Sequence, residues 1–428
     1  MNRTKIELLA PAGSIEKMRY AFAYGADAVY MGIPDFSLRV RINNFTLDTV
    51  EQAIKEAHDL GKKIYVTINI YAHNEHLKNL PDYLKKLKKM KPDAFIISDP
   101  GVMQFAKKYA GQIPIHVSTQ ANVTNWSAAK FWHSQGVERV ILGREVSIEE
   151  IKEIHEKVPE LELEHFIHGA MCMSYSGRCM LSSWLTGRSA NLGDCAQPCR
   201  WKYSPQLAEH HVLSAEVEEP LRPGVKIPVE EDKNGTYIFN SKDMCMIEYL
   251  PEMIETGLVS FKIEGRAKSP AYLASVVKAY RQAFDMLEGE IDKKKAKKKL
   301  KKIKKEILDK LVHRGYTTGF AFGKESVEQN IDNSHIGGEE QFVGEVLNCK
   351  KHDKNYLVKI RPHNAIKLGD ELRIMRPKSE DVRLTIKNMY NEKGEEIESG
   401  HGGAGKNVVL ELDRGVEEFG IVFKNLEL

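Results

Sequence analysis

Residues 46–69 read TLDTVEQAIKEAHDLGKKIYVTIN, in which a helical pattern is followed at once by a strand pattern. Within Thr46–Leu60 the apolar residues recur at steps of three and four, the period of an amphipathic helix. Lys63–Asn69 is a short apolar run rich in β-branched residues, which is typical of a strand. The stretch therefore predicts a helix followed by a strand, the repeating unit of α/β folds.

The same alternation extends over the first 290 residues. The strand candidates are Glu7–Ala10, Ala28–Gly32, Lys63–Asn69, Ala94–Asp99, Ile115–Gln120, Arg139–Arg144, Glu162–His168 and Val259–Glu264. The helix-like runs between them include Thr46–Leu60, Leu77–Lys89, Trp126–Gln135, Ser147–Lys157 and Pro270–Leu287. Eight strand–helix units in this order predict an α/β fold of the (β/α)8 type, a TIM-like barrel with parallel strands. A doubly wound open sheet is the alternative.

Composition indicates an ordinary globular protein with a large core. The 428 residues are 42% hydrophobic and 29% charged, which allows two or three domains. The N-terminus MNRTKIELLAPAG has no apolar signal region, and no later apolar run could span a bilayer. We therefore expect a cytoplasmic protein with no membrane partner.

Changes of pattern predict the domain organisation. We expect the barrel over residues 1–290, with a cysteine-rich insertion over 169–240 after the seventh strand, and a basic helix and linker over 291–338. Residues 339–428 predict a small β-barrel with strands at Phe342–Leu347, Asn355–Ile360, Glu371–Ile374, Val382–Met389, Asn407–Leu412 and Ile421–Lys424. NAIKLGDEL at Asn364–Leu372 is similar to the second-domain barrel of translation elongation factors. That likeness suggests an RNA-docking module, whereas a barrel that only covers the catalytic domain is the alternative.

Four of the six cysteines fall within 28 residues, at Cys172, Cys179, Cys195 and Cys199. Such crowding indicates one metal centre rather than buried, inert thiols, and disulfides would need an oxidising compartment. The gaps of six, fifteen and three residues are looser than the tight pairs common in structural zinc sites. An iron–sulfur cluster tolerates looser spacing, but neither common ferredoxin pattern matches, so zinc stays open.

In a (β/α)8 barrel the reactive groups lie where strands end and the following loops begin. That rule selects Asn69, Asp99, Ser118, Thr119, Gln120, Arg144, Glu145, His168, Glu264 and Arg266. For Asp99, Ser118 and Thr119 the alternative is that they cap the following helices. The cysteine-rich insertion reaches the same face, so we expect a metal centre over the barrel mouth, beside a polar pocket.

Arginines gather near this face and suit an anionic substrate, because guanidinium groups bind carboxylates and phosphates in a bidentate way. With Asn69 and Gln120, the predicted substrate-binding residues are Arg39, Arg41, Arg144, Arg178, Arg200 and Arg266. The alternative is that several arginines form structural ion pairs with Glu145, Glu264 or Asp194.

Positive charge is concentrated in one block. The formal net charge is only +3, but Lys293–Lys305 reads KKKAKKKLKKIKK. A lysine face would contact RNA phosphates, and the residues selected for this role are Lys294, Lys298, Lys301 and Lys305. A solvated helix that only keeps the protein soluble is the alternative.

Several enzyme classes lack their sequence motifs. The chain contains no H-E-x-x-H zinc helix, no G-x-S-x-G elbow, no G-x-G-x-x-G loop and no P-loop. His165 and His168 are three residues apart on one predicted strand, so only one of them can face the barrel mouth. Hydrolytic and nucleotide-dependent chemistry therefore has little support.

Two adjoining runs carry a family resemblance: EHFIHGAMC at Glu164–Cys172 and SGRCMLS at Ser176–Ser182 resemble the signature of the U32 family, historically called collagenase-like peptidases. Further agreement comes from ELLAPAG (Glu7–Gly13), GADAVYMG (Gly25–Gly32), NSKDM (Asn240–Met244), FKIEGR (Phe261–Arg266) and RGYTTGF (Arg314–Phe320). Within that family the chain is most similar to the branch that forms 5-hydroxyuridine at the wobble position of certain tRNAs with prephenate as oxygen donor. RPG at Arg222–Gly224, EED at Glu230–Asp232 and GTY at Gly235–Tyr237 support this branch.

The resemblance implies that the four clustered cysteines hold a 4Fe-4S cluster, with prephenate as co-substrate and tRNA as partner. We select His168, Glu264, Lys242 and Asp243 as the catalytic residues, and we place the two prephenate carboxylates on the arginines of the barrel mouth. The expected activity is that of a tRNA uridine 5-hydroxylase. A peptidase and a non-catalytic tRNA-binding subunit of a modification complex are the alternatives, and a paralogous subunit or a homo-oligomer stays open.

Overall fold

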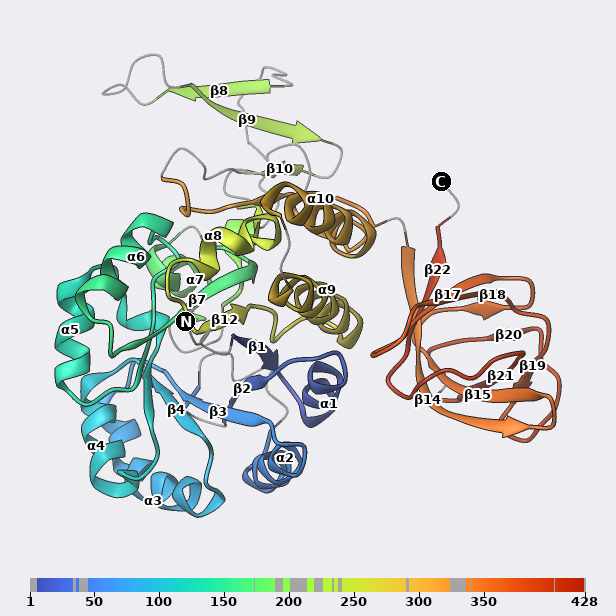
Figure 1. Cartoon of the computed structure of the whole chain (residues 1–428), viewed down its shortest axis with the longest axis horizontal. Coiled ribbons are helices and arrows are strands. Elements are labelled where there is room, and N and C mark those ends of the chain that lie inside the picture. The colour runs from blue at the N-terminus through green and yellow to red at the C-terminus, as the bar shows by residue number, and fades with distance from the viewer. Residues whose placement is uncertain are drawn as a thin grey trace.

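The computed structural model describes residues 6–33, 36–37, 45–172, 174–188, 195–200, 214–218, 226–232, 235–237, 241–289, 292–323, 336–338, 340–403 and 405–426. Figure 1 shows a barrel ringed by helices, with a separate β domain beside it.

Eight parallel strands of the described chain close into a barrel, because the last of them pairs with both the first and the seventh. In barrel order they are β1 (Glu7–Ala12), β2 (Ala28–Gly32), β3 (Lys63–Ile68), β4 (Ala94–Ile97), β5 (Ile115–Val117), β6 (Arg139–Ile141), β7 (Glu162–Gly169) and β12 (Ser260–Ile263). Each overlaps a predicted strand, so the TIM-like barrel is confirmed and the open sheet is excluded. The predicted strand Ile115–Gln120 was too long because the chain turns into a short 3-10 helix, η2 (Thr119–Ala121), after β5.

Helices cover the outside of the barrel, as Figure 1 shows. They are α1 (Ile15–Ala23), α2 (Leu47–Asp59), α3 (Asn74–Met90), α4 (Pro100–Ala110), α5 (Trp126–Ser134), α6 (Ile148–Lys157), α8 (Leu250–Ile254) and α9 (Pro270–Glu288). Asp99 begins α4 by accepting a hydrogen bond from the Val102 amide (3.0 Å), and Ser118 caps η2, so the alternative role as caps holds for both. Within the described residues, no helix combines the length and the apolar character that crossing a bilayer requires.

The insertion after β7 adds short elements near the barrel mouth. β11 (Asp243–Cys245) pairs antiparallel with the end of β7 and parallel with β13 (Tyr316–Thr317). The other elements are the 3-10 turns η3 (Tyr175–Gly177) and η5 (Pro198–Arg200), helix α7 (Leu181–Thr186) and an antiparallel sheet of β8 (Ser214–Glu218), β9 (Lys226–Asp232) and β10 (Gly235–Tyr237). β11 therefore joins the insertion to the end of the barrel from which β7 emerges.

The predicted basic helix is α10 (Lys293–Ile303), which continues into one π-helical turn, η7 (Lys304–Leu308). It packs against α9 and the 3-10 turn η6 (Ile247–Tyr249) through the buried side chains of Ala296 and Leu300. In Figure 1 it lies beside α8 and α9, outside the ring of helices.

The C-terminal domain is antiparallel β, as predicted. Its described strands form a seven-stranded sheet in the order β18 (Val382–Thr385), β17 (Glu371–Met375), β22 (Ile421–Asn425), β14 (Glu340–His352), β15 (Asn355–Pro362), β21 (Val408–Leu412) and β19 (Met389–Asn391). β16 (Ile366–Lys367) and β20 (Ser399–Gly400) pair separately, and two-residue strands carry no periodic signal that the sequence could reveal. The single strand predicted at Val382–Met389 is two strands at opposite edges of this sheet.

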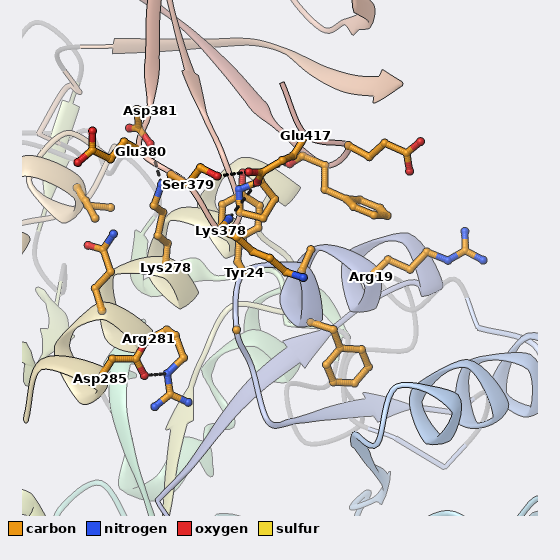
Figure 2. Close-up of a pocket in the computed structure, with 18 of the residues that line it drawn as sticks. Arg19, Tyr24, Lys278, Arg281, Asp285, Lys378, Ser379, Glu380, Asp381 and Glu417 are labelled. Carbon is orange, nitrogen blue, oxygen red and sulfur yellow. Dashed lines mark hydrogen bonds and ion pairs between the residues drawn. The ribbon is translucent and has the colours of Figure 1, made fainter. Parts of the chain in front are cut away.

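The β domain is fixed to the barrel through α1 and α9. Tyr24 Oη donates to the Met375 carbonyl (2.8 Å), and Lys278 Nζ pairs with Asp381 (2.7 Å). A cavity of about 1250 Å³ runs along this contact, and Figure 2 shows its charged lining from both domains. The Arg281–Asp285 pair (2.8 Å) is typical of this lining, in which most cations already contact a carboxylate.

Candidate functional site

The interior of the barrel holds a buried network of charges. Arg139 Nη1 lies 2.6 Å from Glu7 and 3.1 Å from Glu164, and Lys262 Nζ lies 2.7 Å from the other oxygen of Glu164. The side chains of Glu164 and Lys262 are 0% and 4% exposed. Burial lowers the pKa of Lys262, and Glu164 opposes that effect. Sequence reasoning missed this network, although the alternating charges in ELEHF could have indicated an inward polar face.

Three of the predicted residues lie above this network, at the carboxyl ends of the strands. Arg144 follows β6 and places its Nη2 atom 3.4 Å from Glu264, which follows β12. The guanidinium of Arg144 also lies 3.7 Å from the ring centroid of Phe166. Arg266 is buried, with Nη1 3.5 Å from Thr67 Oγ1 on β3. The contact between Arg144 and Glu264 is one of the ion pairs that the sequence alternative named, and it engages only the Nη2 atom of Arg144.

The mouth is cationic among the described residues. Lys262 Nζ and the Arg266 guanidinium lie 4.2 Å and 5.7 Å from the ring centroid of Tyr30, at distances typical of cation–π contacts. With Arg144, the described mouth holds three cationic side chains against the carboxylates of Glu164 and Glu264. This arrangement favours an anionic ligand.

Two contacts tie the cysteine-rich segment to the barrel mouth. Glu145 accepts hydrogen bonds from the Ser176 amide and from Ser176 Oγ (2.8 Å). Arg178 donates through Nε to Tyr71 Oη (2.6 Å) and through Nη2 to the Gln120 carbonyl (2.8 Å). Arg178 and Gln120, both predicted to bind substrate, thus contact each other. In this structure they act as a tether for the segment that carries Cys179.

The four clustered cysteines border this tethered segment. Cys172 and Cys195 are exposed, and Cys179 and Cys199 are half-buried. Thiols are suitable ligands for an iron–sulfur cluster or zinc. However, in the part of the chain that the structure describes, no three His, Cys, Asp or Glu side chains gather closely enough to hold a metal ion.

His168 lies away from the mouth. The register between β7 and β12 shifts beside it, and its ring packs against Tyr272, Tyr280 and Tyr316 with centroids 5.5–6.0 Å apart. Burial lowers the pKa of His168 to about 3, so the ring stays neutral near pH 7. This environment does not suit a residue that exchanges protons in a reaction.

The other predicted catalytic residues are divided between two places. Asp243 of β11 forms a buried ion pair with Arg314, just before β13, in which Nε (3.2 Å) and Nη2 of the arginine both donate to Oδ1. Burial acts to raise the pKa of Asp243, but Arg314 outweighs it and the pKa is lowered. Lys242 is half-buried just before β11. Of the four, only Glu264 lies among the charged groups of the mouth.

The remaining predicted residues are dispersed. Asn69 is buried at the end of β3, next to the mouth. Arg39 and Arg41 lie outside the described residues, as does the side chain of Arg200. The lysines selected for RNA binding are exposed on α10 and η7, on the outer side of the barrel: Lys294, Lys298, Lys301 and Lys305.

Fold and site together define a (β/α)8 barrel protein with a cationic mouth and a cysteine-rich insertion. The chain matches the profile of Peptidase family U32 over residues 13–331 and that of the U32 C-terminal domain over residues 339–422. The protein belongs to peptidase family U32.

Its relatives include proteins named for tRNA hydroxylation and a protein named as a protease. A protein named tRNA hydroxylation protein P from Escherichia coli (strain K12) is 41% identical over 91% of this chain and 90% of its own length. The Haemophilus influenzae protein of the same name is 39% identical over 99% and 96%. A Methanocaldococcus jannaschii protein named as an uncharacterized protease is 37% identical over 96% of both chains.

Proposed function

We propose that this protein hydroxylates the wobble uridine of tRNA to 5-hydroxyuridine, with prephenate as oxygen donor and a 4Fe-4S cluster as cofactor. The observation that carries the proposal is the identity of about 40%, over nearly the full length of both chains, to two proteins named for tRNA hydroxylation. The similarity spans the barrel and the C-terminal domain, so this chain has the same parts as those relatives.

The charge of the barrel mouth supports an anionic co-substrate. Prephenate carries two carboxylates, and Arg144 and Arg266 offer guanidinium groups that can each bind one of them. Lys262 lies below as a third cation, fixed by its contact with Glu164. The two arginines approach the mouth from different strand ends, which suits a ligand with two separated charges.

The arginine assignment is tested by measuring prephenate binding calorimetrically. We expect the double variant Arg144→Ala/Arg266→Ala to bind prephenate at least about a hundredfold more weakly, because neither carboxylate would keep its charge-assisted hydrogen bonds. Arg19→Ala is the matched control, since Arg19 pairs with Glu56 on the helical exterior. Full prephenate affinity in the double variant would refute the assignment.

The cluster assignment rests on the crowding of Cys172, Cys179, Cys195 and Cys199, and it requires their segment to close around the metal. When bound, such a cluster supplies electron-transfer or Lewis-acid chemistry. Anaerobic purification followed by iron, sulfide and zinc analysis tests it. Four iron and four sulfide per chain, absent from Cys→Ser variants at these positions, is the expected result. A preparation with neither iron nor sulfide contradicts it.

The activity is tested by incubating anaerobic protein with prephenate and tRNA from cells that lack the modification, followed by nucleoside mass spectrometry. Prephenate-dependent 5-hydroxyuridine is the expected product. Binding of tRNA without turnover would instead indicate the non-catalytic subunit of a modification complex.

A peptidase is the second candidate, because a relative of this chain is named as a protease. The described residues give it little support. Burial raises the pKa of the Cys245 thiol to about 11, so this cysteine is protonated at neutral pH and a poor nucleophile. Peptide cleavage that survives stringent purification and disappears with one point substitution would establish the peptidase and overturn this preference.

A further inference from the structure

An exposed aromatic pair lies beside the lysine helix. Phe322 is 47% exposed, and its ring meets that of Tyr249 edge-on, with centroids 4.8 Å apart and planes at 61°. Tyr249 ends η6, the turn against which α10 packs. Lys297 of α10 places Nζ 5.8 Å from the Tyr249 ring centroid. The aromatic pair and the lysine helix therefore form one continuous surface, here called the α10 surface.

This surface carries positive charge that nearby carboxylates do not neutralise. Ion pairs within 4.0 Å involve Lys293, Lys301, Lys302 and Lys304. Six other lysines of α10 and η7 form no ion pair within 4.0 Å among the described residues: Lys294, Lys295, Lys297, Lys298, Lys299 and Lys305. All six are exposed. A helix that only needed solubility would not require an exposed phenyl ring at its side.

The α10 surface also continues toward the barrel mouth. The Ala321 carbonyl, next to Phe322, accepts a hydrogen bond from the amide of Ile148 (3.0 Å), the first residue of α6. The loop that leads into α6 carries Glu145, the residue that tethers the cysteine-rich segment. A ligand on the α10 surface would therefore reach the rim of the candidate site.

Cations combined with an open aromatic face are the composition that binds single-stranded nucleic acid. Lysines contact the phosphates, and any of the four bases can stack on the aromatic ring, so binding does not depend on the nucleic-acid sequence. A lysine face alone would bind duplex and single strand alike. The exposed ring of Phe322 therefore favours an unpaired loop over a helical stem.

We propose that the α10 surface binds an unpaired loop of RNA, with one base stacked on Phe322 and the phosphates on the lysines of α10. The inference rests on the proposed function, because it takes tRNA to be the macromolecular substrate. It adds a base-binding residue outside the barrel and outside the lysines selected from the sequence.

The test compares tRNA binding, by fluorescence anisotropy over a range of salt concentrations, between the full-length protein and its variants. We expect Phe322→Ala to weaken binding of a tRNA stem-loop roughly five- to a hundredfold, the range for removal of one base stack. Binding of a blunt RNA duplex should not change, and Phe322→Trp should retain loop affinity. Phe131→Ala is the matched control, because Phe131 is 56% exposed on α5, away from the lysine block.

The salt dependence separates stacking from phosphate binding. Phe322→Ala should leave the slope of log affinity against log salt unchanged, whereas Lys297→Gln/Lys298→Gln should reduce it by about 0.7 for each phosphate that the variant no longer neutralises. Unchanged loop affinity in Phe322→Ala, or an equal decrease for loop and duplex, refutes the stacking site. If the wild type turns over tRNA while Phe322→Ala binds normally, only this inference fails. Absence of both tRNA binding and turnover in the wild type overturns the proposed function instead.

Discussion

The buried contact between Glu164 and Lys262 should be the point at which a minimal change most affects the stability of the barrel. Glu164→Gln removes one negative charge and keeps the shape of the side chain. It leaves Lys262, whose side chain is only 4% exposed, without the carboxylate that lies 2.7 Å away. Arg139 would keep its contact with Glu7, so the destabilisation falls mainly on the lysine.

The magnitude follows from the burial of both groups. Removing one partner of a buried ion pair costs about 3–5 kcal/mol, because the remaining charge then has neither water nor a counter-ion around it. Glutamine can still accept a hydrogen bond from Lys262, so we expect the lower end, about 3 kcal/mol. Glu162→Gln is the control: Glu162 pairs with the same Arg139 at 2.7 Å but is 39% exposed, and exposed pairs contribute about 0–1 kcal/mol.

Urea unfolding of the two variants at pH 7 and pH 9 provides the measurement. Removal of the Glu164 charge should lower the pKa of Lys262 further, since that charge raises it. Above this lowered pKa the unfolded state binds more protons than the folded state, so the variant should regain stability as pH rises. If the unfolding free energies of the two variants differ by less than about 1 kcal/mol at pH 7, the lysine is not a buried charge that needs its partner.

Three further outcomes are expected. Glu145→Gln should speed amide hydrogen exchange in residues 174–180 by roughly ten- to a hundredfold. Ser176→Ala should speed it by less, because the residue-176 amide still donates to Glu145. Equal exchange rates in the wild type and both variants would rule out the tether. Gly169→Ala should lower the free energy of unfolding by at least about 2 kcal/mol, because φ is +110° and a Cβ would lie 2.5 Å from the Glu264 carbonyl oxygen. Gly187→Ala, with open space around its Cβ, should cost only about 1 kcal/mol. Chemical denaturation of both variants decides whether they differ. His168 has a folded-state pKa of about 3, below its unfolded value, so the protein should lose about 1.4 kcal/mol of stability per pH unit as pH falls below 6.5. His168→Phe should flatten this pH dependence in urea titrations. An unchanged pH dependence would mean that the histidine is protonated in the folded state.

Much of the fold could be read from the sequence because its signals are local. The apolar runs at Ala28–Gly32 and Lys63–Ile68 are strands in both the prediction and the structure, since the alternation of helix and strand periods depends only on near neighbours. The errors occur where local signals are weak. The split at Val382–Met389 and the two-residue strands of the C-terminal domain depend on pairing partners distant in sequence.

The candidate site was predictable only in part. The rule that reactive groups follow barrel strands selected Arg144, Glu264 and Arg266. The structure pairs Arg144 with Glu264 and places Arg266 beside Thr67, at another strand end of the same mouth. It also selected His168, which the shift of register beside β12 places among aromatic rings. The sequence showed which residues follow strands, but not which way a shifted strand turns each side chain.

The sequence by itself determined the eightfold strand–helix order, the family and the presence of a concentrated lysine block, because each is a property of consecutive residues. Only the tertiary structure decided that Lys262 and Glu164 share the barrel interior, that Arg178 serves as a tether, and that Phe322 lies beside α10. Those contacts join residues far apart in the chain, and their energies depend on burial and distance, which exist only once the barrel has closed.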